Sequence, residues 1–173
     1  MDPRDGGGVH KWKQRILQMR RSDREITDER SIEAFIAKEQ IMRIAFNDNG
    51  EIYIVPVNYG YIIESDKYVF YFHGAKAGRK YELSKRSPNI GIEIDGNYEL
   101  LESDVACDFS AKFQSVVGTG KISIVGDREE KLKGLNCLML QTSDKTEWRY
   151  SEEMLNTVAV YRVDIDKISC KAK

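Results

Sequence analysis

The sequence feature that most constrains the fold is a hairpin signal followed by a long alternating segment. A short apolar run at 41–46 ends in Asn47-Asp48-Asn49-Gly50, and Asn-Gly suits the positive backbone angles of a tight turn. The segment 51–63 then alternates, which is the pattern of a strand with two different faces. One face would carry Ile52, Ile54, Pro56 and Asn58, and the other Tyr53, Val55, Val57, Tyr59 and Tyr61.

Four further segments have the composition or alternation of strands. They are 67–72, 89–101, 112–125 and 157–166. No regular exchange of strand and helix runs through the chain, so a parallel doubly wound sheet is not expected. Closing an antiparallel sheet into a barrel removes its exposed edges. The pattern therefore predicts a mainly β protein, a β-barrel of six or so antiparallel strands with peripheral helices.

Three helices are predicted between these strands. Thr27 or Asp28 can cap the first, which should end near Gln40. The second runs from Arg79 to Arg86 and is stopped by Ser87-Pro88. The third starts at a capping-box sequence at 127–130 and continues to about Gln141.

Composition limits the classes of function. The 173 residues fit one domain, and 27 basic against 28 acidic residues leave no global reason to expect nucleic-acid or membrane binding. No apolar run approaches the ~20 residues that span a bilayer, and the N-terminus lacks the apolar core of a signal peptide. Three widely spaced cysteines favour neither a disulfide framework nor a metal site. We therefore expect a cytoplasmic protein.

Basic residues are concentrated near the N-terminus, in 11–24. Residues 1–25 are interpreted as a basic arm that is either disordered and solvated or packed on a partner subunit, and residues 26–173 as the folded domain.

The segment from His73 to Lys80 is the strongest candidate for binding chemistry. It leaves a strand, contains Gly74 and Gly78, and opens a helix whose N-terminus presents free N–H groups. Cations are disfavoured at that end of a helix, yet Lys76, Arg79 and Lys80 gather there. A bound phosphate would relieve the conflict. A solvated basic turn with a structural histidine is the alternative, and the segment matches neither a Walker loop nor a dinucleotide fingerprint.

Two strand segments are weaker candidates. In 55–59, Pro56 cannot donate a ladder hydrogen bond, so neighbouring backbone could face a flat ligand, with Asn58 and Tyr59 as contacts. The alternative is a strand kink with a satisfied asparagine. Gln114 and Ser115 are polar side chains in an otherwise apolar strand, which either contact a ligand or belong to one solvated face.

Together these segments resemble a known family. Met19-Arg20-Arg21-Ser22-Asp23-Arg24-Glu25-Ile26, Tyr53 to Tyr61, and Tyr71-Phe72-His73-Gly74-Ala75 with Gly78 and Lys80 look like the nitroimidazole-resistance (Nim) group of the pyridoxamine 5′-phosphate oxidase-like flavoproteins. Cys107-Asp108-Phe109 and Gln114-Ser115-Val116-Val117-Gly118 continue the likeness in the same order. The likeness covers about residues 19–166.

The resemblance implies a split β-barrel homodimer with FMN at the subunit interface. It assigns the phosphate or ribityl chain to His73, Gly74, Lys76, Gly78, Arg79 and Lys80. It assigns the flavin ring to Val55, Pro56, Val57, Asn58 and Tyr59, with Gln114 and Ser115 on an adjacent strand. His73 matches the active-site histidine of the family.

The leading functional hypothesis is therefore an FMN-dependent oxidoreductase that reduces small electron-poor compounds such as nitroimidazoles and other nitroaromatics. The alternatives are a flavin or haem carrier or sensor without turnover, and a deazaflavin-dependent reductase. A vitamin-forming pyridoxamine phosphate oxidase is disfavoured, because the strand motifs of that branch are missing.

Overall fold

The structure, a computed structural model, describes residues 15–16, 20–143, 145 and 148–173. Its strands are β1 (Arg15–Ile16), β2 (Glu25–Ile26), β3 (Ile41–Asp48), β4 (Glu51–Asn58), β5 (Gly60–Glu64), β6 (Lys67–Ala75), β7 (Asn89–Leu101), β8 (Ser110–Ile124) and β9 (Val158–Ala172). Its helices are α1 (Glu29–Lys38), α2 (Arg79–Arg86), α3 (Arg128–Ser143) and α4 (Glu152–Thr157), with 3-10 turns at Ser22–Arg24 and Ala106–Asp108. Most of the predicted basic arm lies outside the described residues.

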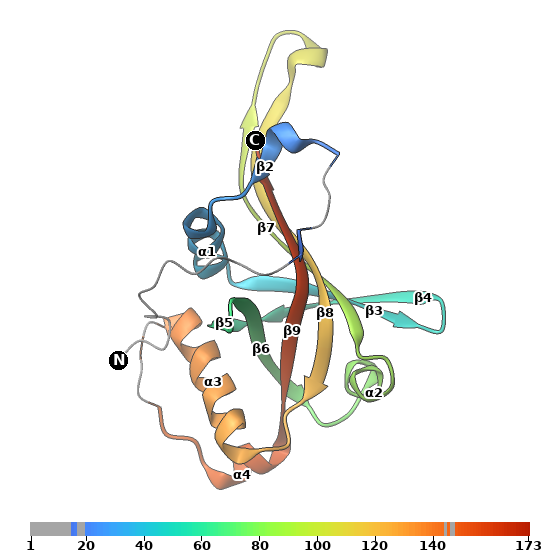
Figure 1. Cartoon of the computed structure of the whole chain (residues 1–173), viewed down its shortest axis with the longest axis vertical. Coiled ribbons are helices and arrows are strands. Elements are labelled where there is room, and N and C mark those ends of the chain that lie inside the picture. Colours follow the sequence, from blue (N-terminus) through green and yellow to red (C-terminus); the bar gives the residue numbers. More distant parts are fainter. Residues whose placement is uncertain (1–14, 17–19, 144, 146–147) are drawn as a thin grey trace.

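The strands form one strongly curved antiparallel sheet in the order β4-β3-β7-β8-β9-β6-β5 (Figure 1). The short β1 and β2 add to β9, the first in parallel and the second antiparallel. The two ends of the sheet, β4 and β5, are consecutive in the chain and separated by Tyr59 alone. The sheet thus curls until its two ends meet at a covalent link, which confirms the predicted split β-barrel with peripheral helices.

The prediction of a single strand at 51–63 is wrong in one respect, because the segment divides at Tyr59 into β4 and β5. This side chain is fully buried, and its hydroxyl donates to the carbonyl oxygen of Ile36 at 2.7 Å. The next residue, Gly60, runs so close to α3 that a Cβ there would lie 2.2 Å from the backbone carbon of Cys137. Close packing on α1 and α3 therefore bends the chain from one end of the sheet to the other. The predicted alternation holds in β4, where Ile52, Ile54, Pro56 and Asn58 are exposed.

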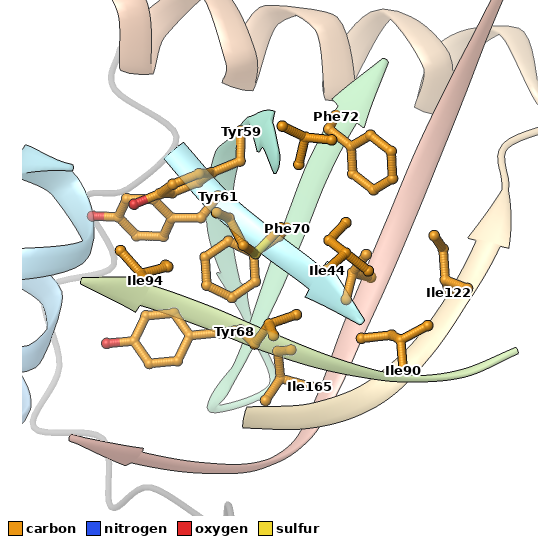
Figure 2. Packing of buried hydrophobic residues seen from close by; sticks show 14 of the residues in the cluster. Ile44, Tyr59, Tyr61, Tyr68, Phe70, Phe72, Ile90, Ile94, Ile122 and Ile165 are labelled. Atoms are coloured by element: carbon orange, nitrogen blue, oxygen red, sulfur yellow. The ribbon is translucent and has the colours of Figure 1, made fainter. Parts of the chain in front are cut away.

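An aromatic core fills the barrel. The rings of Phe72 and Tyr161 stack with their centroids 4.5 Å apart, and Tyr59 meets Phe70 edge-on at 5.4 Å. Figure 2 shows the rings of Tyr59, Phe70 and Phe72 in this core, with isoleucines from β3, β7, β8 and β9 around them. A second apolar cluster joins α3 to the outer side of β5, β6 and β9. Each of the strands β5, β6 and β9 therefore contributes side chains to two cores.

The three predicted helices are present as α1, α2 and α3, and α4 was not predicted. Asp28 caps α1 by accepting the backbone N–H of Ser31 at 2.9 Å. None of the described helices combines the length and apolar character needed to cross a membrane.

The hairpin of β7 and β8 extends past the body of the molecule at the end opposite α2 and α4 (Figure 1). Beyond a register shift at Gly96, its strands pair with each other at Glu99–Lys112, Leu100–Ala111 and Leu101–Ser110. We call residues 97–112 the arm.

Candidate functional site

The predicted phosphate segment connects the end of β6 to the start of α2. Gly78 is the N-cap of α2 with a φ of 94°, a conformation that disfavours side chains other than glycine. Among the described residues, no side chain caps the N–H groups at this helix start, which therefore remain available to a ligand. The predicted break between strand and helix is confirmed, and its geometry suits an anion.

Lys80, in the first turn of α2, is a half-buried cation. Its ammonium lies over the rings of Phe72 and Tyr161, at 5.0 and 5.4 Å from their centroids. Burial lowers the pKa of Lys80, and none of the described carboxylates forms an ion pair with it. A desolvated ammonium with only ring partners would gain from a bound anion.

Gly74 makes room for this ammonium. A Cβ on Gly74 would lie 3.0 Å from the Nζ of Lys80 and 3.4 Å from its Cε. The glycine sits in β6 with an ordinary extended backbone, so the requirement here is space and not a special backbone angle.

Arg79 points to a different surface. Its Nε lies 2.9 Å from Oδ2 of Asp48, a second nitrogen lies 3.1 Å from Glu51, and its guanidinium stacks 4.7 Å from the ring centroid of Tyr53. Asp48 also pairs with Arg86, and these two arginines hold the pKa of its carboxyl below the usual value. The charge of Arg79 is thus neutralised from within the chain.

Lys76 is engaged as well. Its ammonium donates to the carbonyl oxygen of Asn156 in α4, where Lys131 also caps the carbonyls of Leu155 and Val158. The three predicted phosphate cations therefore lie in three environments, and Lys80 alone among them lacks an oxygen partner within the described chain.

His73 is exposed near the end of β6. Strand alternation sets it on the outer side with Tyr71, whereas Phe70, Phe72 and Gly74 belong to the barrel side. Partial burial and the charge of Lys80 lower the pKa of His73, which favours the neutral form of its imidazole. A neutral imidazole can both donate and accept a hydrogen bond.

The predicted ring-binding residues on β4 divide between two faces. Pro56 and Asn58 are exposed, Val55 is half-buried, and Asn58 donates its amide to the carbonyl oxygen of Gln40 at 3.0 Å. Val57 and Tyr59 are in the core, so a flavin could meet them only through their backbone.

Gln114 and Ser115 lie at the root of the arm, far from the phosphate segment. Along β9, the pairing partner of Gly74 is Ala159 and that of Gln114 is Ala172, thirteen residues further on. That separation is about 40 Å along an extended strand. Gln114 also accepts a hydrogen bond from Asn97 at 2.9 Å, and Ser115 is buried. Within one chain the structure does not bring the two segments together.

Sequence reasoning missed the residues that restrain the cations. The sequence pattern indicates only a turn at Asp48, and it does not indicate that Glu51 contacts Arg79 or that Asn156 contacts Lys76. These contacts join segments about 30 to 80 residues apart. No local pattern in the sequence could have indicated them.

The chain resembles several known proteins. The sequence profile of the family described as pyridoxamine 5′-phosphate oxidase matches residues 28–172. A candidate 5-nitroimidazole antibiotic resistance protein from Bacteroides thetaiotaomicron is 28% identical, with a TM-score of 0.74 and 86% of each chain covered. No curated protein matches.

Two more distant structures share the fold alone. The flavocytochrome Anf3 from Azotobacter vinelandii is 19% identical, with a TM-score of 0.73, 90% of this chain and 72% of that chain covered. The FAD and heme binding protein from Mycobacterium smegmatis is 13% identical, with a TM-score of 0.74, 87% of this chain and 73% of that chain covered.

Proposed function

The chain belongs to the pyridoxamine 5′-phosphate oxidase family, and from that premise we propose that it is a homodimeric FMN-binding oxidoreductase. Its substrates are small electron-poor compounds, with nitroimidazoles and other nitroaromatics as the first candidates. The likeness to a candidate nitroimidazole-resistance protein and to flavin-binding proteins of the same fold supports this assignment.

The observation that carries the proposal is the environment of Lys80. A half-buried ammonium with no carboxylate partner among the described residues, the space beside Gly74 and the uncapped start of α2 together fit the phosphate of FMN. A charge-assisted hydrogen bond of this kind contributes about 1.5–3 kcal/mol.

The remaining residues would orient the cofactor and its substrate. When bound, the flavin supplies the electron transfer that the side chains themselves cannot perform. His73, neutral and exposed at the end of β6, can hydrogen-bond the cofactor or substrate and can donate a proton. Pro56 and Asn58, exposed on the edge strand β4, offer the surface for the flat ring.

A second copy of the chain would complete the site. Gln114 and Ser115 lie about 40 Å along β9 from the phosphate segment, too far for one flavin to touch both within one chain. If both segments contact the same flavin, Gln114 and Ser115 come from the partner subunit. This reasoning supports the homodimer.

The first experiment is an absorbance spectrum of the purified protein and a titration with FMN. We expect a flavin band or binding at micromolar affinity or better. Lys80→Ala should weaken FMN binding by about tenfold or more. Lys85→Ala is the matched control, because Lys85 pairs with Glu82 on the same helix at 3.0 Å. A colourless protein that ignores FMN would contradict the proposal, and competing titration with a deazaflavin would reveal the alternative cofactor.

Turnover needs a separate test. The flavin-loaded protein is reduced anaerobically and mixed with a nitroimidazole, and recovery of the oxidised flavin absorbance is followed. Fast reoxidation that slows in His73→Ala supports an oxidoreductase. Tight FMN binding without reoxidation would instead indicate a carrier or sensor.

Haem binding is the second candidate, favoured by the exposed, neutral His73. A Soret band upon haem addition that is lost in His73→Ala would support it.

A further inference from the structure

The arm presents apolar side chains that nothing in the described chain covers. Tyr98 is 72% exposed, Val105 52%, Phe109 48% and Leu100 47%. The sheet pairings of the arm residues are all within the arm, and an isolated two-stranded hairpin is marginally stable in water. A cluster of this kind on a protruding element indicates a contact surface.

A second apolar surface lies on the outer face of the barrel. Ile52 and Ile54 of β4 are 63% and 58% exposed, and Val117 of β8 is 41% exposed. Between them Ala45, Gly91 and Thr119 stand side by side on β3, β7 and β8, as the strand register shows. These small residues form the floor of an open groove of about 480 Å³, which ends at Lys167 on β9.

The two surfaces also carry complementary charge. The arm contains four acidic residues and one lysine. That lysine, Lys112, is already paired with Glu99 at 2.9 Å. On the outer face, Lys121 and Lys167 form no ion pair with another described residue, whereas Asp166, which also lines the groove, is paired with Lys67 at 4.0 Å. The acidic side chains of the arm thus complement the lysines of the outer face, and its aromatic side chains complement the groove.

We propose that the arm of each subunit docks into the outer groove of a second copy of the chain. A twofold dimer places the same two surfaces in contact twice, so both apolar surfaces of each copy would be covered. The proposal rests on the homodimer proposed above and specifies which surfaces form it. The docked arm would also bring Gln114, which follows the arm in β8, to the partner subunit. The proposed flavin site needs this, because Gln114 and the phosphate segment are far apart within one chain.

Disulfide trapping tests this contact directly. Cys107 lies exposed on the arm, whereas Cys137 and Cys170 are buried. The arm therefore already carries one native thiol that can form a disulfide. Thr119→Cys places a second thiol on the groove floor. Mild oxidation should give a covalent dimer that is absent in Thr119→Cys combined with Cys107→Ser. Glu153→Cys on α4, at the opposite end of the molecule, is the control and should give at least about tenfold less covalent dimer.

The second measurement is the oligomeric state by sedimentation. Tyr98→Asp with Phe109→Asp should weaken dimerisation by about tenfold or more, because aromatic side chains dominate interface energies. Trp148→Asp, which changes an apolar residue that is 37% exposed outside the arm, should leave the dimer intact.

The outcomes separate this inference from the proposed function. A dimer that binds FMN but shows neither trapping nor sensitivity to the arm substitutions overturns the docking alone. A trapped dimer that ignores FMN overturns the cofactor alone. A wild-type chain that stays monomeric overturns the dimer and the docking together.

Discussion

The Nε of Arg79 lies 2.9 Å from Oδ2 of Asp48, so an arginine at the start of α2 is held by a carboxylate at the end of β3. Glu51 and the ring of Tyr53 complete its surroundings. Asp48 is only 14% exposed and binds Arg86 as well, which fixes both ends of α2 to the β3–β4 hairpin. Because Arg79 is already paired with carboxylates, Lys80 is the residue whose positive charge is available to bind an anion.

The first prediction follows from this division of roles. Arg79→Ala should change the FMN dissociation constant by less than about threefold, because the guanidinium is already neutralised, whereas Lys80→Ala changes it by about tenfold or more. Fluorescence titration of the two variants measures the difference. An equal loss in both would show that Arg79 leaves Asp48 when the cofactor binds.

The second prediction concerns Gln141 at the end of α3. Its amide nitrogen lies 2.8–2.9 Å from the carbonyl oxygens of Ile36, Ala37 and Glu39, and so satisfies the last turn of α1. Gln141→Leu removes the donor to Ala37 and Glu39, while the carbonyl of Ile36 keeps the hydroxyl of Tyr59, and should lower the free energy of unfolding by about 1–3 kcal/mol. Urea denaturation is the measurement. Ser143→Ala is the control, since that hydroxyl donates to Met139 within the same helix.

The sequence predicted those features that depend on local physics. Alternation correctly assigned the exposed face of β4, and Gly78 with Ser87-Pro88 correctly bounded α2. The break at Tyr59 could not be predicted, because it depends on the backbone of Gly60 approaching Cys137, 77 positions later. The partners of Arg79 and Lys76 could not be predicted for the same reason, because they also lie far away in the sequence. A cluster of cations is visible in a sequence, but the carbonyls and carboxylates that engage them lie on other elements.

The third prediction is a pH dependence of stability. Partial burial disfavours the charged form of Glu64, but hydrogen bonds from Lys133 and Arg162 outweigh it and hold the pKa of Glu64 below its usual value of 4.5. A depressed carboxyl pKa stabilises the fold above the unfolded-state pKa, and this contribution is lost as the pH falls through the folded-state value. The urea concentration at the midpoint of unfolding should therefore decrease as the pH is lowered below about 4.5. Glu64→Gln should flatten that fall, and an unchanged profile would exclude Glu64 as its source.

The fourth prediction concerns His73. Partial burial and the charge of Lys80 hold the pKa of His73 below 6.5. In Lys80→Ala the charge is removed, so the pKa should rise toward the ordinary value. Proton NMR titration of the imidazole signal follows this change, with His10→Ala identifying the other histidine. A pKa that ignores the substitution would mean that the two groups do not interact, and that burial alone sets the protonation of His73.

The fifth prediction separates the space beside Lys80 from the stability of the barrel. In Gly74→Ala the new Cβ would lie 3.0 Å from the Nζ of Lys80, while the strand backbone accepts alanine without strain. The flexible ammonium moves and the fold does not, so the free energy of unfolding should stay within about 0.5 kcal/mol. FMN binding should weaken by about fivefold or more, equivalent to about 1 kcal/mol. Gly126→Ala is the control, since its added Cβ has no neighbour within 4 Å. If Gly74→Ala binds FMN as tightly as the wild type, the phosphate is not held by Lys80 in the position that the structure gives it.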